Sequence, residues 1–176
     1  MAFFQRKSTR LPDYNYNMPG YYFITICTED RKPILSEIVG GGAFDAPNVA
    51  LTKYGEIVQK YILSGNRIPG VAVEKYVIMP NHIHLLLRLD GTVYLGTSRA
   101  PSPTEGRHPT NEQIPHFVST FKRFCHRDIG KTIFQRSYHD HVVRGEQDYL
   151  KIWNYIDTNP ARWEKDCFYP YKENQS

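Results

Sequence analysis

A chain of 176 residues is long enough for one well-buried core and short for two, so we expect a single domain. Apolar residues make up 40% and charged residues 23%, which excludes a disordered polyelectrolyte. No apolar run approaches the roughly 20 residues of a membrane span, and the start of the chain lacks a signal-peptide pattern. We therefore expect no membrane partner and a cytoplasmic protein, nucleoid-associated if its source is prokaryotic.

Charge and aromatic content do not decide whether the protein binds a nucleic acid. The net charge of +4 is compatible with a polyanion but is common among proteins that bind none. Aromatic residues reach 14%, with 13 tyrosines, and unpaired bases stack on such rings, although a tyrosine-rich core is the alternative. The three cysteines form no Cys-x-x-Cys pair, so we expect reduced thiols and no zinc ribbon.

The first third of the chain predicts an arm, a strand and a helix. Residues 1–20 are basic and aromatic and end in Pro19-Gly20, which indicates an arm before the first regular element. Residues 21–28 are rich in β-branched and aromatic side chains, as in a strand. After a glycine run at 40–42, apolar residues at three-four spacing predict a helix over 52–64.

The remaining elements complete a repeated split βαβ order. The pattern predicts strands over 71–79, 82–89 and 136–144, helices over 111–129 and 146–158, and a loop over about 90–111. The expected fold is α+β: a ferredoxin-like four-stranded antiparallel sheet with helices packed on one face and an added C-terminal helix. We expect the domain to span 21–165, followed by a tail at 166–176.

Two histidine pairs are candidate metal clamps. His82 and His84 flank Ile83 at the start of an apolar strand, and alternate side chains of a strand share a face, so both imidazoles can point at one ion. Polar rings in such a strand need a partner to justify burial. His139 and His141 have the same spacing around Asp140, and the spacing alone does not choose between the pairs.

The last predicted helix carries Tyr155 and Asn159 four residues apart, which places a hydroxyl and an amide oxygen on one helix face. Tyr149 is a second tyrosine on the same helix. A core aromatic and a helix-ending Asn-Pro turn are the plain structural alternatives for Tyr155 and Asn159.

Four segments carry a resemblance to a known family and together span most of residues 6–163. They are GYYFITICT at 20–28, VIMPNHIHLL at 77–86, FQRSYHDHVVR at 134–144 and DYLKIWNYIDTNP at 148–160. This combination resembles the single-tyrosine transposases of the IS200/IS605 group, and most closely the REP-associated tyrosine transposases. Their hallmark is a histidine-hydrophobic-histidine motif with a downstream helical tyrosine.

The resemblance implies a division of roles. Tyr155 stands where the family has its nucleophile, His82 and His84 stand at its metal-binding motif, and Asn159 stands at its third metal ligand. Such a mixed nitrogen and oxygen site suits Mn²⁺ or Mg²⁺. The implied activity is nicking and strand transfer of single-stranded or hairpin DNA through a 5′-phosphotyrosine, serving transposition or the handling of REP-type elements.

Basic side chains are the candidates for DNA contact, with solvated surface as the alternative. They are Arg6, Lys7 and Arg10 in the arm, Lys122, Arg123 and Arg127 on the helix at 111–129, and Arg136 and Arg144 flanking the strand at 136–144. His141 lies where the family often has histidine, as a possible supporting residue without an assigned role.

Two rival functions remain. The same sheet architecture serves non-catalytic or domesticated nucleic-acid binders, which stack bases on sheet aromatics and would bind without a metal. A nucleotide hydrolase of the histidine-triad type needs a third alternating histidine, and position 86 is leucine, which argues against it. Monomer and homodimer are equally compatible with the sequence.

Overall fold

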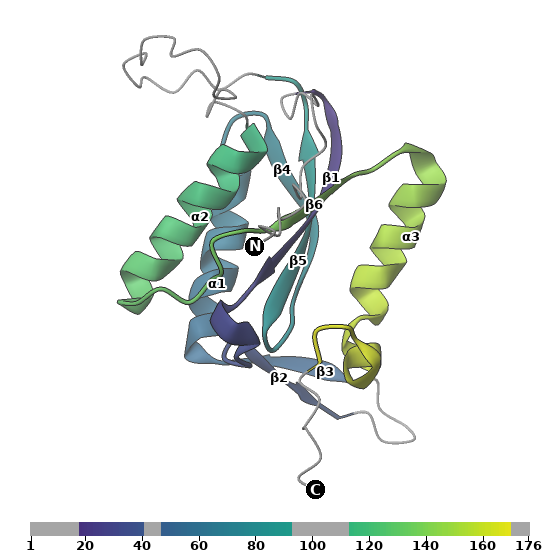
Figure 1. Cartoon of the computed structure of the whole chain (residues 1–176). Helices are drawn as coiled ribbons and strands as arrows, with labels where there is room; N and C mark the ends of the chain where they lie inside the picture. Colours follow the sequence, from purple (N-terminus) through teal and green to yellow (C-terminus); the bar gives the residue numbers. More distant parts are fainter. Residues whose placement is uncertain (1–17, 41–46, 93–112, 170–176) are drawn as a thin grey trace, which may run out of the picture.

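The computed structural model describes residues 18–40, 47–92 and 113–169. Its main sheet contains four strands: β1 (Gly20–Cys27), β4 (Val71–Ile78), β5 (His82–Leu89) and β6 (His139–Val142). They lie in the order β4-β5-β1-β6, and each neighbouring pair is antiparallel (Figure 1). This is the strand order of a ferredoxin-like split βαβ fold, and it confirms the predicted fold class.

Three long helices cover the sheet: α1 (Lys53–Ser64), α2 (Gln113–Ile129) and α3 (Gly145–Thr158). Figure 1 shows α1 and α2 side by side on one face of the sheet and α3 on the other. The Thr52 hydroxyl caps α1 by accepting a hydrogen bond from the backbone N–H of Gly55, which explains why this helix begins at its predicted position. The added C-terminal helix is therefore the element that covers the second face.

The alternation of side chains along β1 and β5 builds two separate cores. Ile24 of β1 and Leu85 of β5 are cross-strand partners that face α1 and α2 in the larger apolar cluster. Leu86, the next residue of β5, packs with Ile152 and Ile156 of α3 in a smaller cluster on the opposite face. Because the side-chain period is two, the even-numbered residues of β5, including both histidines, belong to the α3 face.

Two features differ from the expected elements. Strand β6 pairs with β1 over only four residues, so the segment preceding it, including Arg136, is not strand as expected. A small two-stranded sheet of β2 (Ser36–Val39) and β3 (Asn48–Leu51) was not predicted. Each of these strands has only four residues, too few for a clear alternating pattern, and Ile38 and Val49 are held by packing against the smaller cluster.

Short 3₁₀ turns complete the described chain: η1 (Glu29–Arg31), η2 (Gly65–Arg67) and η3 (Pro160–Lys165). The turn η3 directly follows α3 and brings the chain back towards the histidines. The predicted arm with Arg6, Lys7 and Arg10, and the predicted loop beyond Thr92, lie outside the described residues. Within the described ranges, no helix combines the length and apolar character needed to cross a membrane.

Candidate active site

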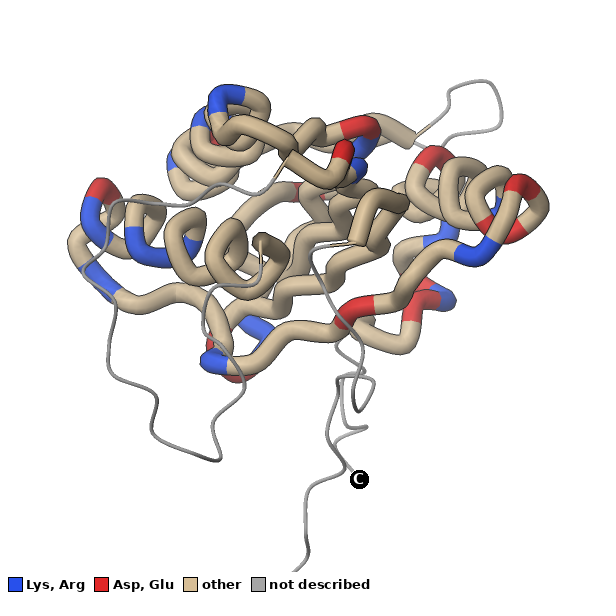
Figure 2. Tube along the Cα trace, turned by 90° about the horizontal axis from the view of Figure 1, so that it is seen from above, with Lys and Arg blue, Asp and Glu red and all other residues tan. Residues whose placement is uncertain are grey.

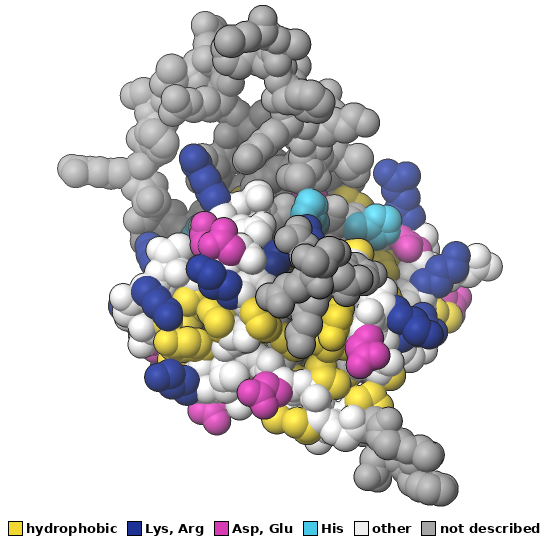
Figure 3. Space-filling view, turned by 60° about the horizontal axis from the view of Figure 1, so that its bottom comes forward, with side chains coloured by type: hydrophobic (Ala, Val, Ile, Leu, Met, Phe, Trp, Pro, Cys, Tyr) yellow, Lys and Arg dark blue, Asp and Glu magenta, His cyan; other side chains and the backbone are white. Residues whose placement is uncertain are grey.

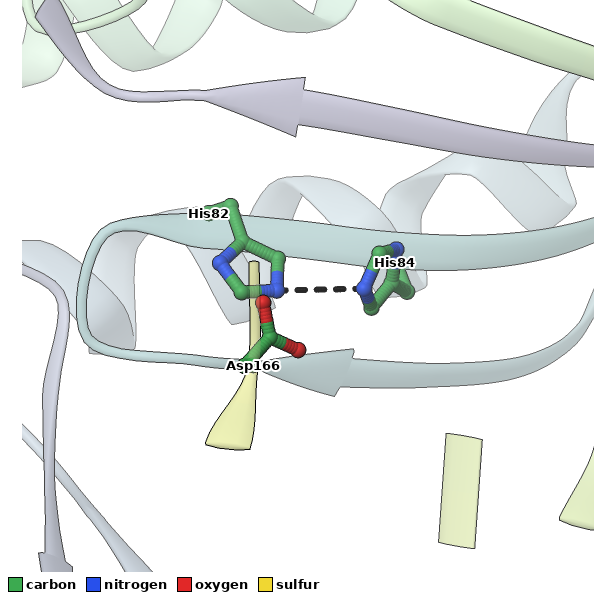
Figure 4. A group of neighbouring side chains, drawn as sticks. All are labelled: His82, His84 and Asp166. Atoms are coloured by element: carbon green, nitrogen blue, oxygen red, sulfur yellow. Dashed lines mark hydrogen bonds between the residues drawn. The ribbon is translucent and has the colours of Figure 1, made fainter. Parts of the chain in front are cut away.

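His82 and His84 lie on the α3 face of the sheet and point at each other. Their Nε2 atoms are 3.1 Å apart, and both side chains are almost completely buried (Figure 4). Burial lowers the pKa of His82 to about 3 and that of His84 well below its usual value, so both rings are neutral at physiological pH. The two Nε2 atoms form a hydrogen bond, and because a neutral imidazole can carry its proton on either nitrogen, each ring can also present an Nε2 lone pair to a cation.

Hydrogen bonds to the other ring nitrogens orient this pair. The Asn81 amide group donates to the carbonyl oxygens of Arg31 (3.2 Å) and Phe168 (2.7 Å), so its Oδ1 is left to accept from His82 Nδ1 at 2.8 Å. His82 therefore carries its proton on Nδ1 and presents a bare Nε2. Thr25, the cross-strand partner of His84, contacts His84 Nδ1 through its hydroxyl at 2.8 Å, and a hydroxyl can accept or donate there.

Asp166 is the third member of the cluster. It follows η3, is buried, and its carboxylate points towards the two rings (Figure 4). One ligand atom from each of His82, His84 and Asp166 lies within 4.8 Å of the other two. Residue 166 was expected to begin a tail, and no local pattern marks it, because only the turn of η3 carries it into the site. Its position beside the two histidines is the main feature of the site that the sequence did not predict.

Tyr155 and Asn159 reach the same place from α3. The Tyr155 hydroxyl lies 3.4 Å from His84 Nε2 and 3.5 Å from Asp166 Oδ2, while Asn159 Nδ2 donates to Asp166 Oδ2 at 3.0 Å. Asn159 is buried, and its Oδ1 has no hydrogen-bond partner among the described residues. Two neutral imidazoles and a carboxylate within reach of one another, together with this buried amide oxygen at the end of the neighbouring helix, offer donor types that fit a divalent cation.

The surroundings of Tyr155 disfavour its phenolate. Burial and the nearby Asp166 carboxylate raise the pKa of Tyr155 to about 12, and a hydrogen bond with Asn159 offsets part of that rise. A hydroxyl with this pKa is a poor nucleophile at neutral pH unless positive charge is placed beside it.

The sequence also offered Tyr149 as an alternative nucleophile and His139 and His141 as an alternative metal-binding pair, and these residues do not belong to the cluster. The Tyr149 ring packs against Tyr21, with 4.8 Å between the ring centroids, and against Trp153. His141 Nε2 forms a hydrogen bond with the Asp148 carboxylate at 2.8 Å, which ties β6 to the first turn of α3. Within the described residues, the side chains grouped closely enough to share a metal ion are His82, His84 and Asp166. His139 and His141 do not belong to this group.

The structure corrects the role predicted for Lys122. This side chain is buried, and its ammonium group donates to the carbonyl oxygens of Gln135, Arg136 and Ser137. Burial lowers the pKa of Lys122 to about 8. Lys122 therefore holds the segment before β6 and is not available to DNA, since three backbone acceptors already occupy its donors.

Four other basic residues predicted to contact DNA lie in the described part of the chain and are exposed: Arg123, Arg127, Arg136 and Arg144. Arg123 and Arg127 lie on α2, on the opposite side of the sheet, and Arg127 also bonds to Asp128 and Tyr61. Arg144 precedes α3 by one residue, roughly 16 Å of helix rise from Tyr155. Figure 2 shows Lys and Arg interspersed with Asp and Glu along the trace. The described basic residues therefore do not form one positively charged face that would by itself locate a DNA-binding surface.

Comparison with known proteins agrees with this architecture. A structure of a REP-associated tyrosine transposase bound to a REP hairpin aligns with a TM-score of 0.56 over 92% of this chain and 74% of that one, at 18% sequence identity. The fold is therefore that of the REP-associated tyrosine transposases, which confirms the predicted resemblance at the level of the fold. No protein-family model matches the sequence.

A sequence relative places the chain in a family. An uncharacterized protein of Haemophilus influenzae is 31% identical to this chain, over 93% of each protein. The chain belongs to the family of this Haemophilus influenzae protein.

Proposed function

We propose that this protein is a metal-dependent nuclease and strand transferase that acts on single-stranded, hairpin-bearing DNA through Tyr155. The observation that carries the proposal is the position of the Tyr155 hydroxyl, 3.4 Å from the Nε2 atom of a buried histidine that faces a second histidine. A helical tyrosine that only fills a core would not need two neutral imidazoles and a carboxylate around its hydroxyl. The REP hairpin bound by the structural relative supports the choice of substrate.

The metal would be held by His82, His84 and an oxygen ligand. Asp166 joins the candidates because of its place in the cluster, and Asn159 remains one because of its unpartnered Oδ1. Nitrogen and oxygen donors together favour Mn²⁺ over Mg²⁺, which is the weaker nitrogen binder. When bound, the ion would supply positive charge that polarises the phosphate and stabilises the phenolate.

In the proposed reaction the Tyr155 oxygen forms a bond to phosphorus while the bond to the 3′-oxygen of the preceding nucleotide breaks. The tyrosine loses its proton, the leaving strand gains one at its 3′-hydroxyl, and the other strand remains attached as a 5′-phosphotyrosine. Because the number of phosphoester bonds is unchanged, a second 3′-hydroxyl can reverse the step and join a new strand. Cutting and joining then require no ATP.

The alternative is a nucleic-acid binder that has the fold but performs no chemistry, as a domesticated relative would. It predicts binding that does not depend on a metal ion, and no covalent product. The buried histidines favour the enzyme, because a binder gains nothing from imidazoles that are desolvated and hidden from solvent.

The test is incubation of the wild type, Tyr155→Phe and Tyr149→Phe with labelled hairpin DNA from the ends of the protein's own locus, with Mn²⁺ or EDTA. Denaturing electrophoresis then separates covalent adducts. We expect an adduct that requires Mn²⁺, disappears in Tyr155→Phe and persists in Tyr149→Phe. Binding without an adduct in any metal would favour the binder, and an adduct that survives Tyr155→Phe would move the nucleophile to another residue.

A further inference from the structure

Two hollows in the surface meet at Tyr155. One, of about 480 Å³, is lined by Phe23, by Arg162 and by side chains along α3 that include Lys151 and Ile152. The other, of about 610 Å³, is lined by Arg162, Lys165 and the cluster residues Asn159 and Asp166. Tyr155 and Arg162 are the two residues that border both. A strand that extends from one hollow into the other would therefore pass Tyr155 and Arg162.

The two hollows differ in chemistry. The second contains the oxygen ligands of the candidate metal site, so it suits a phosphate under attack. The first is bordered by Phe23 of β1, whose ring stacks on His84 with 5.1 Å between centroids and meets the Tyr155 ring edge-on at 6.0 Å. Phe23 is only partly buried. An aromatic ring wedged beside both a metal-binding histidine and the nucleophile offers a flat apolar surface next to the reacting atoms.

Charge around these hollows favours an anionic chain. Lys151, Arg162 and Lys165 are exposed, and none of them belongs to an ion pair within the described part of the chain. None of the described residues lining the hollow beside Phe23 is acidic. Figure 3 shows one face of the molecule, on which basic, acidic and hydrophobic side chains are mixed. Basic groups interleaved with apolar surface match a strand whose phosphates alternate with bases.

We propose that the hollow beside Phe23 is a nucleotide subsite: Phe23 stacks on the base adjoining the phosphate that Tyr155 attacks, and Arg162 binds a backbone phosphate at the junction of the two hollows. The inference rests on the proposed function and assigns two residues to substrate binding. A base can stack on Phe23 only if it is unpaired, which agrees with the single-stranded substrate already proposed. Phe23 and Arg162 are separated by most of the chain, and the fold brings them to one place.

The test measures binding without chemistry. Tyr155→Phe protein in EDTA is titrated with a labelled single strand of about ten nucleotides, and with the same strand made abasic throughout, so that the two probes differ only in their bases. We expect the base-bearing strand to bind more tightly, and Phe23→Leu to remove roughly 5- to 100-fold of that preference, while Phe23→Tyr retains it. Arg162→Gln should weaken both strands alike and reduce the slope of log K against log salt by about 0.7.

Matched controls are Phe124→Leu on α2 and Arg67→Gln in η2, which should change neither quantity. Circular dichroism and thermal unfolding of every variant show whether it is folded. If Phe23→Leu does not fold, the test rests on Phe23→Tyr, which keeps an aromatic ring and should keep the preference for the base-bearing strand. An unchanged preference in folded Phe23→Leu, or an unchanged salt slope in Arg162→Gln, would overturn the subsite. The proposed nuclease would survive that result if the wild type still forms its adduct. A subsite confirmed here, with no adduct in the wild type, would instead refute the nuclease alone.

Discussion

The Nε2 atoms of His82 and His84 face each other across 3.1 Å in a buried pocket, and the Tyr155 hydroxyl lies 3.4 Å from the second of them. Without a cation the two neutral rings form a hydrogen bond, in which His84 Nε2–H donates to the bare Nε2 of His82. A bound cation would replace that proton, with His84 then carrying its proton on Nδ1 beside the Thr25 hydroxyl. The arrangement comes from adjacent elements on one side of the sheet: β5 supplies the rings, and α3 supplies the hydroxyl.

Thr25→Val tests whether the orientation of His84 matters for metal binding. The hydroxyl of Thr25 contacts His84 Nδ1 at 2.8 Å, and valine keeps the shape of the side chain but removes that contact. Loss of such an outer-shell partner typically weakens metal affinity by about 10- to 100-fold. Isothermal titration calorimetry with Mn²⁺ measures it, and Thr120→Val on α2 is the matched control. Equal affinities in the two variants would contradict the prediction.

Asp166→Asn tests the carboxylate that the sequence did not reveal. An amide is similar in size but neutral, so a cation bound by Asp166 should lose affinity, by roughly tenfold or more. Glu164→Gln, two residues earlier and exposed, should bind as the wild type does. The readout is the dissociation constant for Mn²⁺. If Asp166→Asn binds normally while Asn159→Ala does not, the oxygen ligand is Asn159, as the family resemblance implies.

The ionisation of Tyr155 should depend on the ion. Burial and Asp166 hold its pKa at about 12, so at pH 8 only roughly one molecule in ten thousand carries the phenolate. Adding Mg²⁺ should lower that pKa, and adduct formation should speed up as the pH rises towards the lowered value. The pKa is followed by NMR of ¹³Cζ-labelled tyrosine, with Tyr155→Phe identifying the signal. A signal that titrates identically with Mg²⁺ and with EDTA would argue against a cation beside the hydroxyl.

Acid should destabilise the metal-free protein through its buried histidines. His82 has a folded-state pKa of about 3, far below the usual 6.5, and that of His84 is lowered in the same direction, in each case chiefly by burial. Below pH 6.5 the unfolded chain binds protons that the folded chain does not, so the free energy of unfolding falls with pH, by up to about 1.4 kcal/mol per pH unit for each histidine. Above pH 6.5 this contribution is constant.

Urea unfolding in EDTA at pH 7.5 and pH 5 measures this dependence. His82→Gln should reduce the loss of stability on acidification, because glutamine does not titrate. His126 is also partly buried, and its lowered pKa adds to the same trend, so His126→Gln is the comparison that separates the contribution of the site. A wild type that is equally stable at both pH values would show that the rings are not held neutral by burial.

The sequence by itself determined the main helices and strands, and which candidate site residues share one face of the same element. Alternation in β5 put both histidines on one face, and helical spacing put Tyr155 and Asn159 on one side of α3, because these periods are local properties of the backbone. The family motifs then distinguished His82 and His84 from His139 and His141, which spacing alone did not. The strand order followed from the sequence of elements, since split βαβ connections permit few arrangements.

Only the tertiary structure decided which distant residues complete the site. Asp166, Arg162 and Phe23 are ordinary residues in their own segments, and they lie near Tyr155 because η3 follows α3 and β1 lies beside β5. Thr25 contacts His84 for the second of these reasons. Lys122 was predicted to contact DNA, but it is buried and donates to backbone carbonyl oxygens of the segment before β6. These acceptors lie outside the helix that contains Lys122, so the sequence did not predict them. A periodic pattern indicates which face a side chain occupies, but its neighbours there come from other parts of the chain and are set by long-range packing.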